Sequence, residues 1–382
     1  MNNYDYIVAG AGAAGLSLIA HMIHSGQFND KKILLIDRSP KTQNDRTWCF
    51  WEREPGLFES IVHKKWNRMW FHGVEGVSRL HDISPYLYKM IRGIEFYEYC
   101  FNLIGKHENI TVEYGAIAKI QSSDSGTFVL FGGRQINATY IFSSISNVNE
   151  YARDGHYFLW QHFKGWFIQA EKDLFNPDEA TLMDFRIGQE NDTRFAYVMP
   201  FNKNKALVEY TIFSENRLFD EEYNEGLRNY CSRGLLLKNN EYSITNEEFG
   251  MIPMTNYEFT SSHHNIIYIG SAGGKTKASS GYTFRFIQKH SEQIVRSLVN
   301  RGSPHLRQQD KKFDFYDSIL LKILAEKKLS GAYIFTKLFE KNKMIEVFKF
   351  LDNETSVGED LKLISSLPKT KFIGAAFSHL FK

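Results

Sequence analysis

The feature that most constrains this chain is a glycine-rich turn near its start. An apolar stretch at residues 4–9 predicts a buried strand, and Gly10, Gly12 and Gly15 follow it before a helical stretch at 16–25. Gly10 permits a tight turn, Gly12 lets the backbone approach a diphosphate, and Gly15 lets the helix pack closely on the strand. The helix N-terminus would hold the diphosphate, because unpaired N–H groups and the helix dipole favour negative charge there.

A second strand and an acidic residue complete a βαβ unit. Residues 32–36 predict a strand, and Asp37 ends it about 20 residues beyond the glycines, where a ribose-binding carboxylate is found. The alternative is a Gly/Ala-rich helix start followed by an acidic loop residue. Because strand, turn, helix, strand and acid occur in this order, we predict a nucleotide-binding site.

A second glycine-rich turn lies between a strand predicted at 265–269 and a helix predicted at 282–299. It resembles the distal flavin-contacting turn of two-domain flavoproteins, which favours FAD over free NAD; the alternative is an ordinary strand–loop–helix. An Asp usually follows the first glycine in flavin hydroxylases, and Ser271 stands there instead, which argues against a hydroxylase. The candidate cofactor-binding residues of this turn are Gly270, Ser271, Gly273, Gly274 and Gly281.

The rest of the chain changes character twice. Residues 155–255 alternate apolar and polar side chains in short runs, which is typical of an antiparallel sheet, and the apolar spacing within 85–103 predicts a helix. We therefore predict an α/β fold: a Rossmann-type FAD-binding domain interrupted by an antiparallel β-rich substrate domain, with a C-terminal helical region. The predicted boundaries are 1–80, 105–150 and 256–302 for the first domain, 81–104 and 151–255 for the second, and 303–382 for the third.

Composition excludes several classes of protein. A net charge of +2 gives no long-range field for a phosphate backbone, so no nucleic-acid partner is expected. Cys49, Cys100 and Cys231 are odd in number and far apart, which predicts neither disulfides nor a metal site and favours a reducing compartment. No apolar run approaches the roughly 20 residues that span a bilayer, and no signal peptide is recognised, so we expect a soluble or membrane-surface protein.

Six short blocks, in order along the chain, resemble the motif series of bacterial lycopene cyclases. The last departs from the family's Pro-x-Thr-Gly-Tyr, because Ala278 stands at the proline position and Ser280 at the threonine, whereas Gly281 and Tyr282 match. The blocks are 47–50, 160–166, 182–184, 207–211, 250–255 and 270–282.

The resemblance implies a redox-neutral, carotenoid-biosynthetic enzyme that closes β-ionone rings on the ends of lycopene, through a monocyclic carotene. It implies FAD in its reduced form, with NAD(P)H as the reductant. Such chemistry needs a carboxyl kept protonated by burial, surroundings that tolerate a cation, and a base. Two alternatives stay open: an FAD-dependent prenyl reductase or hydroxylase acting on an apolar isoprenoid, and a non-catalytic flavin-binding or carotenoid-carrier protein.

Glu209 is the candidate general acid. It lies in the alternating run 206–212, on one face with Leu207 and Thr211, and the resemblance matches it to the family's motif glutamate. On pattern alone, a strand glutamate is more often solvated or salt-bridged. Asp184 is the candidate second carboxylate, and pairing with a nearby arginine is its structural alternative.

Aromatic side chains make up 15% of the chain and could line a polyene tunnel or simply fill cores. The candidates for lining a tunnel are Trp48, Trp160, Phe163, Trp166 and Tyr282.

The tail from residue 311 to 382 holds thirteen lysines against nine acidic residues, with apolar residues at helical spacing between them. A helical cap on the main body explains this pattern, and so does attachment to an anionic membrane surface. Attachment to a membrane surface would make this a peripheral protein on the cytoplasmic side of a membrane, with these helices at the entrance for lycopene.

Overall fold

The computed structural model describes residues 3–124, 126–146, 150–151, 155–306 and 311–380. The chain begins with strand β1 (Asn3–Ala9), helix α1 (Ala13–Ser25) and strand β2 (Ile33–Asp37), as the sequence predicts. Both strands run parallel and are almost entirely buried at their inner residues, because each is covered on two faces.

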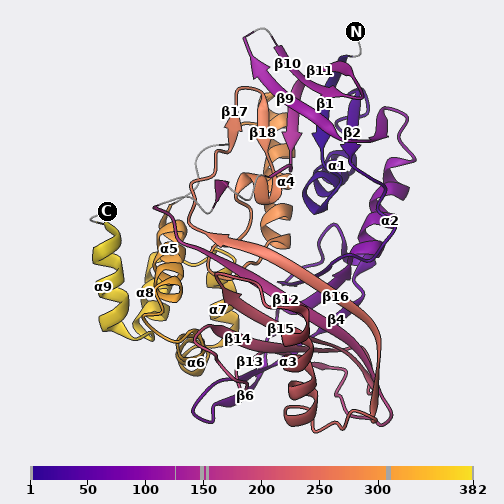
Figure 1. Ribbon diagram of the computed structural model, residues 1–382. Coiled ribbons are helices and arrows are strands. Elements are labelled where there is room, and N and C mark those ends of the chain that lie inside the picture. The colour runs from indigo at the N-terminus through magenta and orange to yellow at the C-terminus, as the bar shows by residue number, and fades with distance from the viewer. Residues whose placement is uncertain (1–2, 125, 147–149, 152–154, 307–310, 381–382) are drawn as a thin grey trace.

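The first βαβ unit lies at the centre of an eight-stranded sheet in the order β17-β18-β11-β1-β2-β8, to which β10 and β9 are added beyond β11 (Figure 1). Helix α4 (Phe284–Arg301) packs on α1, as does α2 (Gly93–Ile104). The remaining strands are β8 (Ile110–Tyr114), β9 (Ile117–Ser123), β10 (Gly126–Phe131), β11 (Arg134–Ser143), β17 (Ser262–His263) and β18 (Ile266–Tyr268).

A second, seven-stranded sheet has the order β16-β12-β15-β14-β13-β5-β6 and is antiparallel except where β13 meets β5. The alternation at 155–255 is thus confirmed as a sheet. Residues 68–82, of which the sequence places 68–80 with the first domain, add two strands at one end of it, β5 next to β13 and β6 at the edge. The strands are β5 (Arg68–His72), β6 (Ser78–Asp82), β12 (Phe158–Ala170), β13 (Glu179–Asp184), β14 (Thr193–Pro200), β15 (Lys205–Ser214) and β16 (Tyr242–Thr255).

A small three-stranded sheet joins the two large ones. It consists of β3 (Thr47–Glu52), β7 (Leu87–Arg92) and β4 (Lys64–Trp66), and a 3-10 turn η1 (Glu59–Ile61) precedes β4. The helix predicted at 85–103 is wrong over its first half, which contains β7. Pairing of β7 with both neighbours fixes an extended backbone there, and only the second half belongs to α2.

The two faces of the seven-stranded sheet are covered differently. Helix α3 (Asp220–Arg233) covers one face, where Trp166 and Tyr210 pack against its Tyr223 and Leu227. The other face, which carries Leu207 and the side chains alternating with it, packs against the small sheet and the C-terminal helices. Alternation along each strand therefore decides which of two separate environments a side chain enters.

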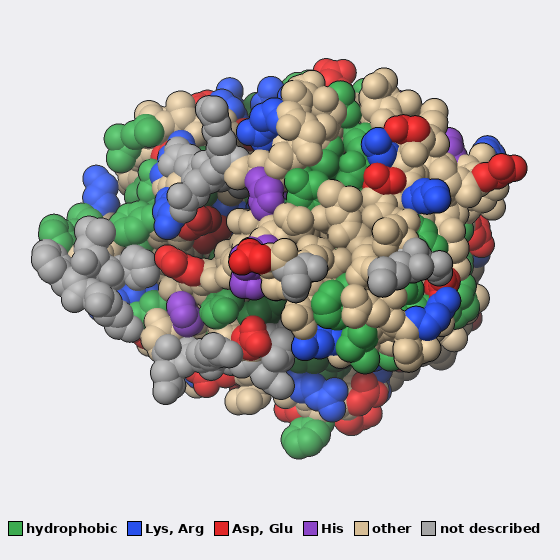
Figure 2. Space-filling model, turned by 90° about the horizontal axis from the view of Figure 1, so that it is seen from above, with side chains coloured by type: hydrophobic (Ala, Val, Ile, Leu, Met, Phe, Trp, Pro, Cys, Tyr) green, Lys and Arg blue, Asp and Glu red, His purple; other side chains and the backbone are tan. Residues whose placement is uncertain are grey.

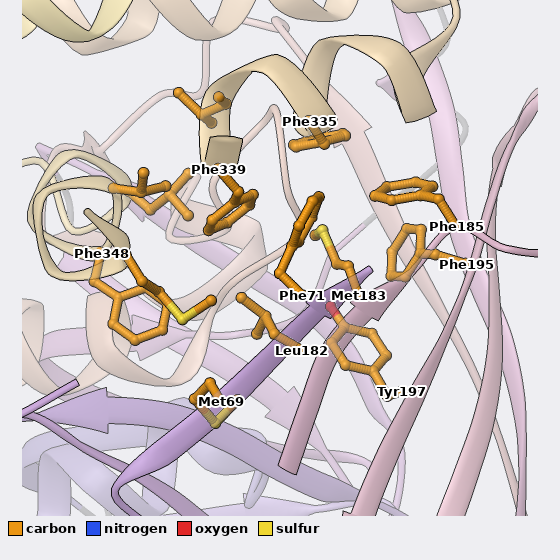
Figure 3. Packing of buried hydrophobic residues seen from close by; sticks show 14 of the residues in the cluster. Met69, Phe71, Leu182, Met183, Phe185, Phe195, Tyr197, Phe335, Phe339 and Phe348 are labelled. Carbon is orange, nitrogen blue, oxygen red and sulfur yellow. The ribbon is translucent and has the colours of Figure 1, made fainter. Parts of the chain in front are cut away.

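The C-terminal helices are part of the main core. Figure 3 shows Phe335 and Phe339 of α6 and Phe348 of α7 directed at Phe71, Phe185 and other side chains of the sheet. A helical cap on the body is therefore confirmed for these helices, although residues 381–382 of the tail lie outside the described residues. The helices are α5 (Lys312–Ala325), α6 (Gly331–Lys341), α7 (Met344–Leu351), α8 (Val357–Ser365) and α9 (Lys369–Leu380).

The surface seen in Figure 2 mixes basic, acidic and hydrophobic side chains without one dominant charge, as the small net charge predicts. Within the described ranges, no helix is long and apolar enough to cross a bilayer.

Candidate active site

The three glycines of the first turn meet different surroundings. A Cβ on Gly10 would lie 2.2 Å from the Ser144 hydroxyl oxygen, and one on Gly15 would lie 2.0 Å from the Gly10 carbonyl oxygen. A Cβ on Gly12 would meet nothing within 4 Å. Gly10 and Gly15 are thus required by packing, whereas the space in front of Gly12 is open at the N-terminus of α1. That terminus carries no acidic residue in its first turn, so it can accept a diphosphate.

Asp37 lies directly beneath this turn at the end of β2. Its carboxylate accepts a hydrogen bond of 2.6 Å from the Ala11 amide and forms an ion pair of 3.0 Å with Lys41. These contacts fix the carboxylate beside the open space, where the sequence predicts a ribose contact.

The second glycine turn contacts the first. The 3-10 turn η3 (Gly270–Gly273) packs on the start of α1, and a Cβ on Gly270 would lie 2.7 Å from that of Ala14. Gly270 and Gly274 have positive φ angles of 59° and 68°, which glycine adopts without strain. Ser271 is partly exposed in this turn. The two turns therefore converge on one helix N-terminus, and their residues fit an FAD whose diphosphate lies at Gly12.

Two buried glutamates face each other across a glycine in the seven-stranded sheet. Gly165 of β12 pairs with Glu209 of β15 on one side and with Glu248 of β16 on the other. Directly opposite residues share a face, and neighbouring strands lie about 4.8 Å apart, so both carboxyls project over the gap at Gly165. A Cβ at Gly165 would lie 2.9 Å from Glu248 Cγ, so glycine leaves the space that the two carboxyls share.

Each of these carboxyls receives one hydroxyl hydrogen bond. Thr211 donates to Glu209 Oε1 and Thr47 donates to Glu248 Oε2, both at 2.6 Å. Glu248 Oε1 is buried without a hydrogen-bond partner among the described residues. Both side chains are 8% exposed, and neither forms an ion pair within the described part of the chain.

The environment disfavours the charged form of both glutamates. Burial, together with the negative charge of Glu248, raises the pKa of Glu209 to about 8. Burial raises the pKa of Glu248 to about 7, against the opposing effect of the Thr47 hydrogen bond. Burial and the nearness of the two acids therefore keep at least one of these carboxyls protonated near neutral pH.

Neutral side chains surround the pair. Tyr197 lies opposite Glu209 on β14, Tyr282 packs edge-on against Trp51 with its ring centroid 4.6 Å away, and the Cys49 thiol contacts Met199. Burial raises the pKa of the Tyr88, Tyr197 and Tyr282 hydroxyls and of the Cys49 thiol, with a smaller contribution from Glu209. All four groups therefore stay uncharged, and the site combines a proton donor with aromatic walls.

The structure separates Asp184 from Glu209. In the strand register, Asp184 lies opposite Ala196, and Ala196 lies on the face of the sheet that α3 covers, as Tyr210 does. Glu209 lies opposite Tyr197, on the other face. The Asp184 carboxylate is fully buried and accepts hydrogen bonds from Arg186 (2.7 Å and 2.9 Å) and Tyr230 (2.9 Å). Hydrogen bonds from Arg186 outweigh burial and keep the pKa of Asp184 below its usual range. Its surroundings match the structural alternative.

Only some of the residues predicted to line a tunnel lie on the face of the sheet that carries Glu209. Phe163 lies on the face of Glu209, between Thr211 and Gly250, and Tyr282 reaches the same face. Trp160 and Trp166 alternate with Phe163 and Gly165, and therefore point to the opposite face. Trp48 packs on Phe284 and Phe96 in the core of the nucleotide-binding sheet, away from the carboxyl pair.

Sequence reasoning missed Glu248, Thr47 and Cys49. Glu248 stands two residues before the recognised block 250–255, and Thr47 and Cys49 lie inside the block 47–50, where only Trp48 was singled out. The strand alternation of β3 was the signal available: Trp48 points to one core, and its two neighbours point to the carboxyl pair.

The overall fold is shared with flavoproteins. A geranylgeranyl bacteriochlorophyll reductase-like protein from Thermoplasma acidophilum is similar over 98% of each chain, with a TM-score of 0.64 and 11% identity. A flavoprotein/dehydrogenase from Cytophaga hutchinsonii matches over 99% of this chain and 100% of its own, with a TM-score of 0.62 and 12% identity. The fold is that of FAD-dependent oxidoreductases.

Sequence comparison gives the family. The family model described as lycopene cyclase protein matches residues 5–376, so the chain belongs to the lycopene cyclase family. A lycopene beta-cyclase of Pantoea ananas is 26% identical over 261 residues, which cover 66% of this chain and 63% of that protein. The matched part thus spans less than two thirds of that relative. The resemblance noted in the sequence is confirmed at the level of the family.

Proposed function

We propose that this protein is a lycopene β-cyclase, which closes the ψ-ends of lycopene to β-ionone rings by way of monocyclic γ-carotene. The observation that carries the proposal is the buried pair Glu209 and Glu248 on either side of Gly165, where burial raises the pKa of both carboxyls. Membership of the lycopene cyclase family supplies the substrate class.

In the first step, the Glu209 carboxyl donates its proton to the terminal alkene. A C–H bond forms, and the positive charge develops on the tertiary carbon. Tyr88 and Tyr197 are buried near the pair, Tyr282 is partly buried and packs against the same core, and the face of an aromatic ring has a negative potential that favours such a charge. Because no lysine or arginine is paired with the two glutamates in the described residues, no fixed positive charge opposes the cation.

In the second step, the neighbouring double bond attacks the cation and the ring closes through a C–C bond. The Glu248 carboxylate then removes a proton, for which its unpartnered Oε1 is available. One proton enters and one leaves, so product and substrate have the same mass. Proton transfer from Glu248 to Glu209 across the gap at Gly165 restores the starting state.

The glycine turns support FAD as the cofactor, held at the N-terminus of α1 by Gly12 and at the second turn by Gly270 and Gly274. When bound in its reduced form, FAD supplies electron density that offsets the positive charge of the reacting carotenoid. NAD(P)H is the proposed reductant, needed to reduce the flavin and not consumed in each turnover.

We further propose that the protein binds peripherally to the cytoplasmic side of a membrane through its last two helices. Val357 and Leu361 of α8 and Ile373 and Phe377 of α9 are 53–62% exposed. The exposed lysines Lys362, Lys369 and Lys371 lie among them, and this combination suits an anionic bilayer surface.

A reductase is the second candidate, because the fold likeness to a geranylgeranyl bacteriochlorophyll reductase-like protein extends over nearly the whole chain. A reductase would consume NAD(P)H stoichiometrically and would add hydrogen to the substrate.

The test is expression in bacteria that accumulate lycopene, followed by chromatography and mass spectrometry of the pigments. A change from red to orange with unchanged mass supports the cyclase. A heavier product would identify a reductase, and lycopene bound but unchanged would identify a carrier.

A further inference from the structure

The turn that carries Gly281 and Tyr282 is closed on itself. The Ser280 and Gly281 amides donate to the Lys277 carbonyl at 3.3 Å and 2.8 Å, and the Lys277 amide donates to the Tyr282 carbonyl at 2.8 Å. Ala278 therefore occupies the second position of a β-turn, the position that proline pre-organises by fixing φ. Alanine leaves φ free at this position, so other contacts must hold the shape of the turn.

A buried ion pair connects the same turn to helix α5. Lys277 Nζ lies 2.9 Å from Asp317 Oδ1 on α5, with side-chain exposures of 1% and 9%. Lys277 also donates to Asp317 Oδ2 at 3.0 Å, and the Ser279 hydroxyl of the same turn donates to Oδ1 at 2.7 Å. Lys277 also donates to Asn353 beyond α7 at 2.8 Å.

The turn contacts both halves of the proposed active site. A Cβ on Gly281 would lie 2.0 Å from Gln161 Oε1 on β12, so the turn lies directly on the sheet that carries Glu209. Thr283 Oγ1 donates to Thr276 Oγ1 at 3.1 Å, which in turn lies 3.3 Å from Ser271 Oγ in the second glycine turn. A displacement of the turn would therefore move Tyr282 and the flavin-side glycines together.

We propose that Asp317 is a positioning residue, which supplies the rigidity that Ala278 does not give the turn. By clamping Lys277 and Ser279, it holds the turn 277–282 between the FAD site and the carboxyl pair. The C-terminal helical region thereby becomes necessary for the geometry of the site. The consequence for catalysis rests on the proposed function, but the clamp itself can be tested without it.

The test compares the purified full-length protein with two single variants. Asp317→Asn removes the carboxylate charge that pairs with Lys277, and Asp360→Asn is the matched control. Asp360 is another buried α-helical aspartate of the C-terminal region, ion-paired to Lys312 at 2.8 Å and not in contact with the turn. The readouts are hydrogen exchange of the peptide 277–282 without FAD, and the FAD dissociation constant from flavin fluorescence.

We expect Asp317→Asn to speed exchange in 277–282 and to weaken FAD binding by at least about tenfold, because breaking a buried pair leaves an unmatched charge. Asp360→Asn should leave both quantities unchanged. Adding Ala278→Pro to Asp317→Asn should restore most of the protection and of the affinity, which a merely structural role would not predict.

Equal exchange in 277–282 for Asp317→Asn and Asp360→Asn would overturn the proposal, as would failure of Ala278→Pro to restore it. If Asp317→Asn does not fold, Ser279→Ala removes one contact of the clamp and should give a smaller change in the same direction. No change in that variant would count against the clamp. If neither the wild type nor any variant cyclises lycopene, but the exchange pattern is as expected, the proposed function is refuted and the positioning role of Asp317 is not.

Discussion

At the scale of single residues, the decisive contrast is between Glu209 and Asp184, two buried acids on opposite faces of one sheet. Asp184 is paired with Arg186, which holds its pKa low, whereas Glu209 accepts a hydrogen bond from Thr211 and lies near a second acid, with no ion-pair partner among the described residues. The first arrangement stabilises a charge, and the second stores a proton.

Replacing Glu209 by Gln should abolish ring formation, because the amide has no proton to donate to an alkene. We expect a loss of at least about 100-fold in the cyclisation rate, the usual contribution of a general acid. Pigment analysis gives the rate, and flavin absorbance shows whether FAD remains bound.

The control for this variant is Glu247→Gln. Glu247 precedes Glu248 in the chain, but it is half exposed and paired with Lys164 on the other side of the sheet. The Glu247→Gln protein should cyclise lycopene at the rate of the wild type. Substantial cyclisation by Glu209→Gln would remove Glu209 from the mechanism.

The activity should depend on pH in a bell shape. With pKa values near 7 and 8 for Glu248 and Glu209, both acids are protonated at low pH and no base is present. At high pH both are ionised and no acid is present. The ratio kcat/KM should therefore peak between these values, and Glu248→Gln should flatten the acid limb of its remaining activity. A profile without a decline on the alkaline side would contradict the assignment of the acid.

At the scale of elements, the glycines at the start of α1 have separable roles. Gly12→Val adds a side chain to open space, so the protein should fold normally while the added methyl groups occupy the position of the FAD diphosphate. We expect a normal melting temperature and loss of bound flavin.

Gly15→Val is the matched variant. Its side chain would collide with the Gly10 carbonyl, so the fold itself should be destabilised along with FAD binding. A Gly12→Val protein that retains its flavin would show that the diphosphate lies elsewhere.

The arrangement of the elements also explains which features could be predicted from the sequence. The first βαβ unit was predicted at the right residues because its strand, turn and helix are local and follow one another. Glu209 was predicted on its strand for the same reason. Its partner Glu248 was missed because only the pairing of both strands with β12 brings them together, 39 positions apart. Likewise, the helical apolar spacing at 86–92 could not reveal that β3 and β4 would pair with this segment.

At the scale of the whole molecule, the proposed membrane surface can be tested by vesicle flotation. The double variant Leu361→Ser/Phe377→Ser removes two exposed apolar side chains of the last helices. It should float several-fold less than the wild type with phosphatidylglycerol-rich vesicles, and salt should weaken the binding of both.

Phe219→Ser/Leu236→Ser is the matched control. These side chains are 83% and 81% exposed, but they flank α3 on another part of the molecule. Equal flotation of both double variants and the wild type would exclude the last two helices as the attachment surface. Deleting the tail from residue 303 is a poor substitute, since it removes Phe335 and Phe339 from the core.

That dependence of the core on α6 has a consequence for biosynthesis. The aromatic side chains that cover the sheet face come from α6 and α7, which follow every strand of the sheet in the chain, so this face stays uncovered until those two helices have been translated. Premature stop codons anywhere before α7 should accordingly yield aggregating polypeptides rather than shortened enzymes, and heterologous expression should benefit from chaperones that bind nascent chains.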